Sequence, residues 1–104
     1  VRPQTVCAEI RHVTDILERS LAPSDLAVDS QMGDEAVLLN LESGLYFGLD
    51  PVGTWIWGHL KQGLAAREIC ALTVREFGVP EAQVESDLRN FLADLIENGL
   101  LEAH

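Results

Sequence analysis

The chain has 104 residues, 47% of them apolar, which is the length and composition of a single globular domain. Its formal net charge of −10, from 17 acidic and 7 basic side chains, argues against phosphate backbones and anionic lipid surfaces as partners. No apolar run approaches the roughly 18 residues that a membrane span needs, and the first residues lack a secretory apolar core. We therefore expect a cytoplasmic domain with no nucleic-acid partner and no membrane partner.

Residues 1–23 are predicted to form an N-terminal helical extension. Thr5 is a plausible N-cap, and apolar residues recur after it at helical spacing, namely Val6, Ile10, Val13, Leu17 and Leu21. Such a helix must cover its apolar stripe, either against its own domain or against a second chain. A homodimer through this helix is therefore one alternative. Pro23 disfavours helix at the residue before it, so the domain proper is expected over residues 24–104.

Three short strands are predicted next, over residues 26–30, 35–40 and 45–49. The first alternates in polarity, the second is apolar enough to be central, and the third is rich in β-forming residues. Glycine-containing turns separate them. Two short connections in succession indicate an antiparallel meander, in which the first and third strands are the edges.

Three helices follow the strands. The first is expected to begin at Pro51 with Asp50 as its N-cap, and to carry an apolar face that consists of Val52, Trp55, Ile56 and Leu60. The second is expected over residues 65–77, ended by Gly78. The third is expected over residues 80–99, after which Leu100 and Leu101 return to the core. This order predicts an α+β fold that is winged-helix-like, with a three-stranded antiparallel sheet followed by three helices and an extra N-terminal helix.

The inventory of reactive residues does not favour an enzyme. His12, His59 and His104 stand at no metal-ligand spacing, and no nucleophile, phosphate-binding or dinucleotide motif is present. Cys7 and Cys70 lie far apart and are expected to be free thiols. We expect no catalysis, no metal and no cofactor.

The third predicted helix also argues against a DNA-binding version of this outline. It carries Arg89 alone against five carboxylates, those of Glu81, Glu85, Asp87, Asp94 and Glu97. A recognition helix needs side chains that donate to phosphates and base edges. This helix is therefore not expected to enter a DNA groove.

The third strand, residues 45–49, is instead suited to pairing with a peptide. It lacks the lysine, proline or bulge with which proteins protect an edge strand. Gly48 permits another backbone to come close, so a peptide can add to this edge as a fourth strand. The third helix carries more apolar residues than a narrow stripe needs, namely Val84, Leu88, Phe91, Leu92, Leu95 and Ile96. Either some of them line a groove beside the strand, or all of them belong to the core.

The chain resembles the PqqD-like family in the runs Val37-Leu38-Leu39-Asn40, Ser43-Gly44-Leu45-Tyr46-Phe47-Gly48-Leu49-Asp50, Gly53-Thr54-Trp55-Ile56-Trp57 and Leu95-Ile96-Glu97-Asn98-Gly99-Leu100-Leu101. The resemblance covers about residues 24–101 and rests on apolar placement and turn residues. It implies a non-catalytic recognition element that binds the leader region of a ribosomally made precursor peptide. The leader would lie beside the third strand and against the third helix. The implied peptide-binding residues are Leu45, Tyr46 and Phe47 on the strand, and Val84, Asp87, Leu88 and Phe91 on the helix.

The Tyr46-Phe47 strand and the Trp55-Ile56-Trp57 helix look most like stand-alone members from lasso-peptide pathways. That version implies a leader peptidase and a cyclase as partners. The nearest alternative is the pyrroloquinoline quinone pathway, in which the partner is a radical enzyme. The other alternative is a protein–protein or dimerisation module without peptide binding.

Overall fold

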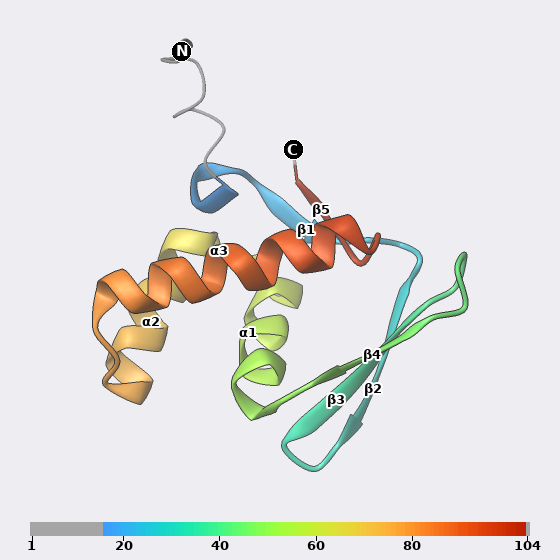
Figure 1. Cartoon of the computed structure of the whole chain (residues 1–104), viewed down its shortest axis with the longest axis horizontal. Helices are drawn as coiled ribbons and strands as arrows, with labels where there is room; N and C mark the ends of the chain where they lie inside the picture. The colour runs from blue at the N-terminus through green and yellow to red at the C-terminus, as the bar shows by residue number, and fades with distance from the viewer. Residues whose placement is uncertain (1–15, 104) are drawn as a thin grey trace, which may run out of the picture.

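The computed structural model describes residues 16–103 (Figure 1). The elements in chain order are the 3₁₀ turn η2 (Ile16–Glu18), β1 (Leu21–Pro23), β2 (Ala27–Met32), β3 (Glu35–Asn40), β4 (Tyr46–Leu49), α1 (Pro51–Lys61), α2 (Ala66–Phe77), α3 (Glu81–Glu97) and β5 (Leu101–Ala103). The predicted α+β fold with a three-stranded sheet followed by three helices is therefore confirmed. No helix in the described part of the chain is both long and apolar enough to cross a bilayer.

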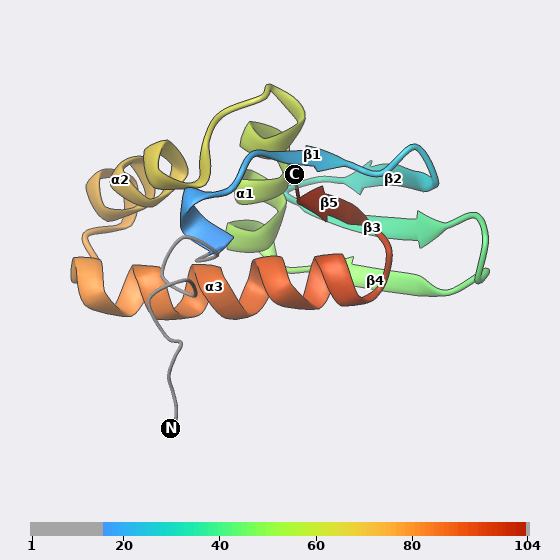
Figure 2. The ribbon, with the colours of Figure 1, turned by 90° about the horizontal axis from the view of Figure 1, so that it is seen from above.

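Strands β2, β3 and β4 form an antiparallel meander in that spatial order, as predicted. The side chains of β3 alternate between two faces: Ala36 and Leu38 are buried, whereas Val37 and Leu39 are only half-buried. The buried face packs on α1. Figures 1 and 2 show this sheet at one end of the molecule and α2 at the other, with α3 running along the length between them.

The helix ends follow from capping residues that were recognisable in the sequence. The Asp50 side chain accepts a hydrogen bond of 2.7 Å from the N–H of Gly53, which satisfies one of the free donors in the first turn of α1. Pro51 occupies the first helical position. Gly78 ends α2 at a φ of +67°, in the left-handed region that glycine adopts without strain. The predicted starts of α1 and α2 and the end of α2 hold to within about one residue because these signals are local, whereas α3 ends at Glu97, before the predicted end at residue 99.

The apolar face predicted for α1 was partly wrong. Ile56 and Leu60 are buried, but Val52 is exposed, and Trp57 is buried at 3% exposure. Trp57 reaches inward because its indole N–H donates to a carboxylate of the sheet, as described below. A tryptophan ring can be buried where its N–H finds a partner.

The predicted N-terminal helix does not extend to Leu21. Residues Ile16–Glu18 form a single 3₁₀ turn, and β1 pairs antiparallel with β5, with Leu21 opposite Ala103. Leu17 and Leu21 are buried in the main core. The helix prediction was wrong here because the strand that pairs with β1 lies some 80 residues away in sequence, where a local pattern cannot reveal it. The rest of the predicted helix, with Val6, Ile10 and Val13, lies outside the described residues.

The amide of Asn40 connects the sheet to the end of α3. Its Nδ2 donates to the carbonyl oxygen of Asn98 at 2.8 Å, and its Oδ1 accepts from the N–H groups of Glu42 at 2.8 Å and Ser43 at 3.1 Å. Asn40 is only 4% exposed, and a Cβ at Gly99 would lie 2.8 Å from its Nδ2. The side chain therefore shapes the β3–β4 turn and sets where α3 ends against it.

The carboxylate of Asp29 joins β2 to α1. Its Oδ2 accepts from the Trp57 indole N–H at 2.7 Å and from Lys61 Nζ at 2.7 Å. The hydrogen bond from Lys61, followed by the one from Trp57, lowers the pKa of Asp29 below its usual value of 3.8. The ionised form of Asp29 is thus favoured by the folded state.

We predict that Asn40→Ala lowers the free energy of unfolding by about 1–3 kcal/mol, because the carbonyl of Asn98 loses its donor and the turn loses two hydrogen bonds. Urea unfolding followed by circular dichroism measures this change. Asn90→Ala, at an exposed position of α3, is the matched control and is expected to change stability by about 0.5 kcal/mol or less. Equal losses in the two variants would contradict the connecting role of Asn40.

We predict that Asp29→Asn flattens part of the acid dependence of stability. Because the folded pKa of Asp29 lies below 3.8, its ionised form stabilises the fold above that pH, and this contribution is lost as the pH falls from about 4 through the lowered pKa. The difference between the urea midpoints at pH 7 and at pH 3 should therefore be smaller for Asp29→Asn than for Asp25→Asn. Asp25 is an exposed carboxylate outside this cluster. Parallel pH profiles for the two variants would refute the assignment.

Candidate functional site

The backbone of β4 presents unpaired groups along the outer edge of the described sheet. The N–H of Asn40 donates to the carbonyl oxygen of Leu45 at 3.0 Å, so the backbone of Leu45 faces β3. In an antiparallel ladder this direction alternates from residue to residue. The N–H and C=O groups of Tyr46 and Gly48 therefore point away from β3, toward the free edge. Among the described strands none lies on that side.

The side chains of β4 divide between the two faces of the sheet. Phe47 and Leu49 lie on the inner face, where Leu49 is buried and Phe47 is half-buried against the core. Tyr46 lies on the other face and is 70% exposed, and Leu45, just before the strand, is 57% exposed. The edge thus combines free backbone groups with exposed apolar side chains.

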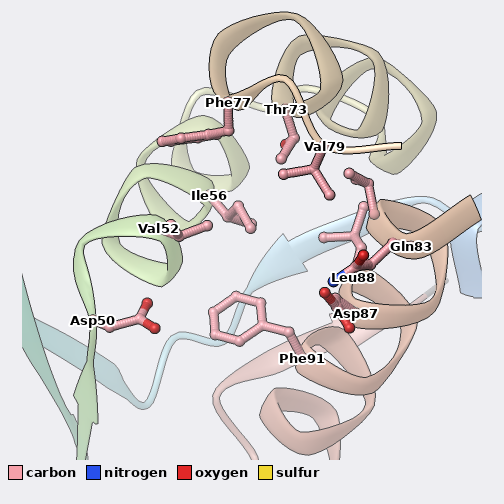
Figure 3. Close-up of a pocket in the computed structure, with 11 residues that line it drawn as sticks. Asp50, Val52, Ile56, Thr73, Phe77, Val79, Gln83, Asp87, Leu88 and Phe91 are labelled. Carbon is pink, nitrogen blue, oxygen red and sulfur yellow. The ribbon is translucent and has the colours of Figure 1, made fainter. Parts of the chain in front are cut away.

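A pocket of about 530 Å³ opens between α1, the end of α2 and α3 (Figure 3). Its walls are mostly apolar, and the residues that line it are Asp50, Val52, Ile56, Thr73, Phe77, Val79, Gln83, Val84, Asp87, Leu88 and Phe91. Asp50 follows β4 directly, so the edge strand leads to the mouth of the pocket. This volume lies within the range of about 300–1,000 Å³ that is typical of ligand pockets.

The apolar residues of α3 serve both the core and the pocket. Val84 and Leu88 are 5% and 2% exposed, so they form the pocket floor as part of the core, whereas Leu92 and Leu95 are buried as well but do not line it. Phe91 is half-buried and extends from α3 toward the start of α1 (Figure 3). The alternative in which all six apolar residues of this helix serve only the core is therefore wrong, because Val84, Leu88 and Phe91 line the pocket.

The structure brings together the four helix residues predicted for the site, because Val84, Asp87, Leu88 and Phe91 all line the pocket. The three predicted strand residues, Leu45, Tyr46 and Phe47, do not line it. They lie on and just before the edge strand that leads to the pocket. The predicted residues thus form two adjoining parts, an edge and a pocket.

The sequence prediction missed the wall opposite α3. Val52 and Phe77 are 38% and 41% exposed, which is high for large apolar side chains on helices that otherwise face the core. The Phe77 ring also meets Trp55 edge to face, with centroids 5.2 Å apart. Periodicity assigned Val52 to the apolar face of its helix, and the exposure of Val52 and Phe77 became visible only once α1 and α2 were placed in space.

The two charged residues that line the pocket, Asp50 and Asp87, are both acidic. Residues 20–60, which include the sheet and most of α1, contain no lysine or arginine but six carboxylates, those of Asp25, Asp29, Asp34, Glu35, Glu42 and Asp50. Asp50 and Asp87 stand on opposite sides of the pocket (Figure 3). The site therefore favours an apolar ligand with a neutral or positive character.

The described residues offer no reactive group at this site. No three of their His, Cys, Asp or Glu side chains are arranged to hold a metal ion. Cys70 is a buried free thiol, and burial, followed by the nearby Glu85 carboxylate, raises its pKa, which keeps the thiol protonated at neutral pH. Cys7 lies outside the described residues. The geometry of the site is suited to holding a ligand.

Comparison with known proteins agrees with this geometry. The family model described as Coenzyme PQQ synthesis protein D (PqqD) matches residues 35–101. The solved structure described as "TbiB1 in Complex with the TbiA(beta) Leader Peptide" is 43% identical, covers 80% of this chain and 96% of its own, and superposes with a TM-score of 0.77.

A second solved structure, "Lasso peptide synthetase B1 complexed with the leader peptide", has 23% identity and a TM-score of 0.73, with 80% of this chain and 98% of its own covered. At that identity the likeness supports the fold. The search of curated proteins found no significant match. The family match spans more than half of the chain, and the 43% identity with TbiB1 extends along nearly all of that protein. The chain therefore belongs to the PqqD family.

Proposed function

We propose that this chain binds the leader region of a ribosomally made precursor peptide and delivers it to modifying enzymes without catalysing a reaction. The observation that carries the proposal is the free edge of β4, which runs into the apolar pocket at Asp50. An extended leader can pair with the outward backbone groups of Tyr46 and Gly48. It can then place an apolar side chain between α1 and α3. TbiB1, which is 43% identical, was solved with a leader peptide.

Within this function we favour a lasso-peptide pathway, with a leader peptidase and a cyclase as the enzymes served. What supports it is the Tyr46-Phe47 edge and the Trp55-Ile56-Trp57 helix, in which the sequence resembles stand-alone members from lasso-peptide pathways. The family description points to pyrroloquinoline quinone synthesis as the second candidate, with a radical enzyme as partner. We propose residues 24–104 as the recognition domain, with η2 and β1 packed on its core.

The proposal is tested by titrating the chain with the leader peptide encoded by a neighbouring precursor gene. Trp55 is a suitable reporter because its ring contacts Phe77, which lines the pocket. We expect a saturable change in tryptophan fluorescence with a dissociation constant in the micromolar range or below, confirmed by calorimetry. A scrambled leader is the control. Equal binding of both peptides, or of neither, would refute the function.

We predict that backbone N-methylation of the leader weakens binding at every second position within the segment that pairs with β4. Only alternate residues of an added strand direct their N–H toward Tyr46 and Gly48. Each blocked bond should cost about 0.5–1.5 kcal/mol, a loss of roughly 2- to 13-fold in affinity. Calorimetry with singly methylated peptides measures the pattern, and the peptide change leaves the protein fold intact. Losses without this alternation would contradict strand addition.

We predict that Val52→Asp weakens leader binding by roughly 10- to 100-fold, because it places a charge in the apolar wall of the pocket. Burial of an aliphatic leader side chain against this wall is expected to stabilise the complex by about 1.5–3 kcal/mol. The domain should stay folded, since Val52 is 38% exposed and an acidic residue is favourable in the first turn of a helix. Ala71→Asp, at an exposed position of α2, is the matched control with the same charge change. Leu88 is unsuitable for this test because it is a core residue.

A further inference from the structure

The face of the three-stranded sheet opposite α1 is apolar and exposed. The register aligns Val28, Leu39 and Tyr46 in one row across the three strands. Val28 is 45% exposed and Tyr46 is 70% exposed, while Leu39 is half-buried and does not pack against the core. We call this surface the outer sheet face. Its apolar residues are Val28, Met32, Val37, Leu39 and Tyr46, and the register places Ser30 opposite Val37 and Glu35 opposite Met32 on the same face.

The exposed large apolar side chains of the described residues fall into two main groups. Val52 and Phe77 line the pocket that the proposed function already uses. Val28, Met32 and Tyr46 lie on the outer sheet face, and Met32 is 62% exposed at the end of β2. Leu26 and Leu41 extend this face by one more pair, because the N–H of Leu41 donates to the carbonyl oxygen of Leu26 at 2.9 Å. Contiguous exposed apolar surface of this kind marks a protein interaction site.

The charges at the border of this face decide between a second copy and a different partner. The turns at its two ends carry Asp34 and Glu42, and β3 begins with Glu35. All three carboxylates are exposed, and no basic residue occurs in the sequence between Arg19 and Lys61. Two copies meeting face to face would bring these carboxylates together within chains that each carry a net charge of −10. A partner with an apolar centre and a lysine- and arginine-rich border fits instead.

The outer sheet face also adjoins the proposed leader site. Tyr46 places its side chain on this face, while its backbone groups point to the free edge of β4. A leader strand added at that edge would extend the same face by one strand. A protein docked on the face would therefore touch the leader at the moment it is presented.

We propose that the outer sheet face is the docking surface for the enzyme that acts on the bound leader, through an apolar centre bordered by basic residues. The identity of this enzyme as a leader peptidase rests on the proposed function, whereas the surface itself does not. The test therefore uses two separate titrations, one with the purified leader peptidase encoded beside the precursor gene and one with the leader peptide alone.

Val28→Lys and Met32→Lys are the test variants, and Ala71→Lys on the exposed side of α2 is the matched control. We expect each test variant to weaken peptidase binding at least 10-fold and to change leader affinity by less than about twofold. Ala71→Lys should change neither. Raising the salt concentration from 50 to 300 mM should weaken peptidase binding to the unmodified chain, because the border charges are exposed.

Unchanged peptidase affinity in both folded variants would overturn the proposal. The proposal would also be overturned if sedimentation shows that the unmodified chain is a dimer and that Val28→Lys is a monomer, because the outer sheet face would then bind a second copy of the chain. If the leader peptide does not bind, but the peptidase binds and Met32→Lys abolishes that binding, the proposed function is refuted and the docking surface is retained. Circular dichroism melting confirms folding, and Met32→Lys, at the more exposed site, carries the test should Val28→Lys unfold.

Discussion

The hydrogen bonds of the Asn40 amide fix the position of the edge strand relative to α3. One side of the amide holds the β3–β4 turn, and the other holds the end of α3. β4 begins directly after that turn and leads to the pocket, and α3 supplies the pocket floor. For one extended peptide to contact both the edge and the pocket, as proposed, the distance between β4 and α3 has to stay constant. A side chain outside the pocket lining thus sets the spacing on which the proposed joint use of edge and pocket depends.

The elements that the sequence predicted correctly are those whose signals are local. Asp50 and Pro51 start α1, Gly78 ends α2, and the short turns order the three strands, since each depends on neighbours a few residues away. The pairing of β1 with β5 could not be predicted in this way, because neither three-residue strand has a pattern of its own. Leu17 and Leu21 fit a helical spacing equally well. Only the tertiary structure decides between the two.

The candidate site was predictable from α3 and only partly from the rest of the chain. The surplus of apolar residues on that helix left a groove and a core position equally open, and it was the family resemblance that singled out Val84, Leu88 and Phe91. The missing protection of residues 45–49 pointed to the edge. Val52 and Phe77 could not be assigned to the pocket, because their apolar character is equally typical of a core position. Whether other side chains cover such a residue depends on the angle between the helices, and the periodicity of the sequence does not reveal this angle.

The unprotected edge of β4 has a consequence for the chain when it holds no peptide. An edge strand with free backbone groups and exposed apolar side chains is a template for uncontrolled strand pairing, which leads to aggregation. Lysines on the strand would prevent this, but they would also hinder the pairing on which the proposed function depends. The net charge of −10 provides a different protection, because like-charged copies repel before their edges meet. Colloidal repulsion can thus replace local shielding and leave the edge open to a peptide of suitable charge.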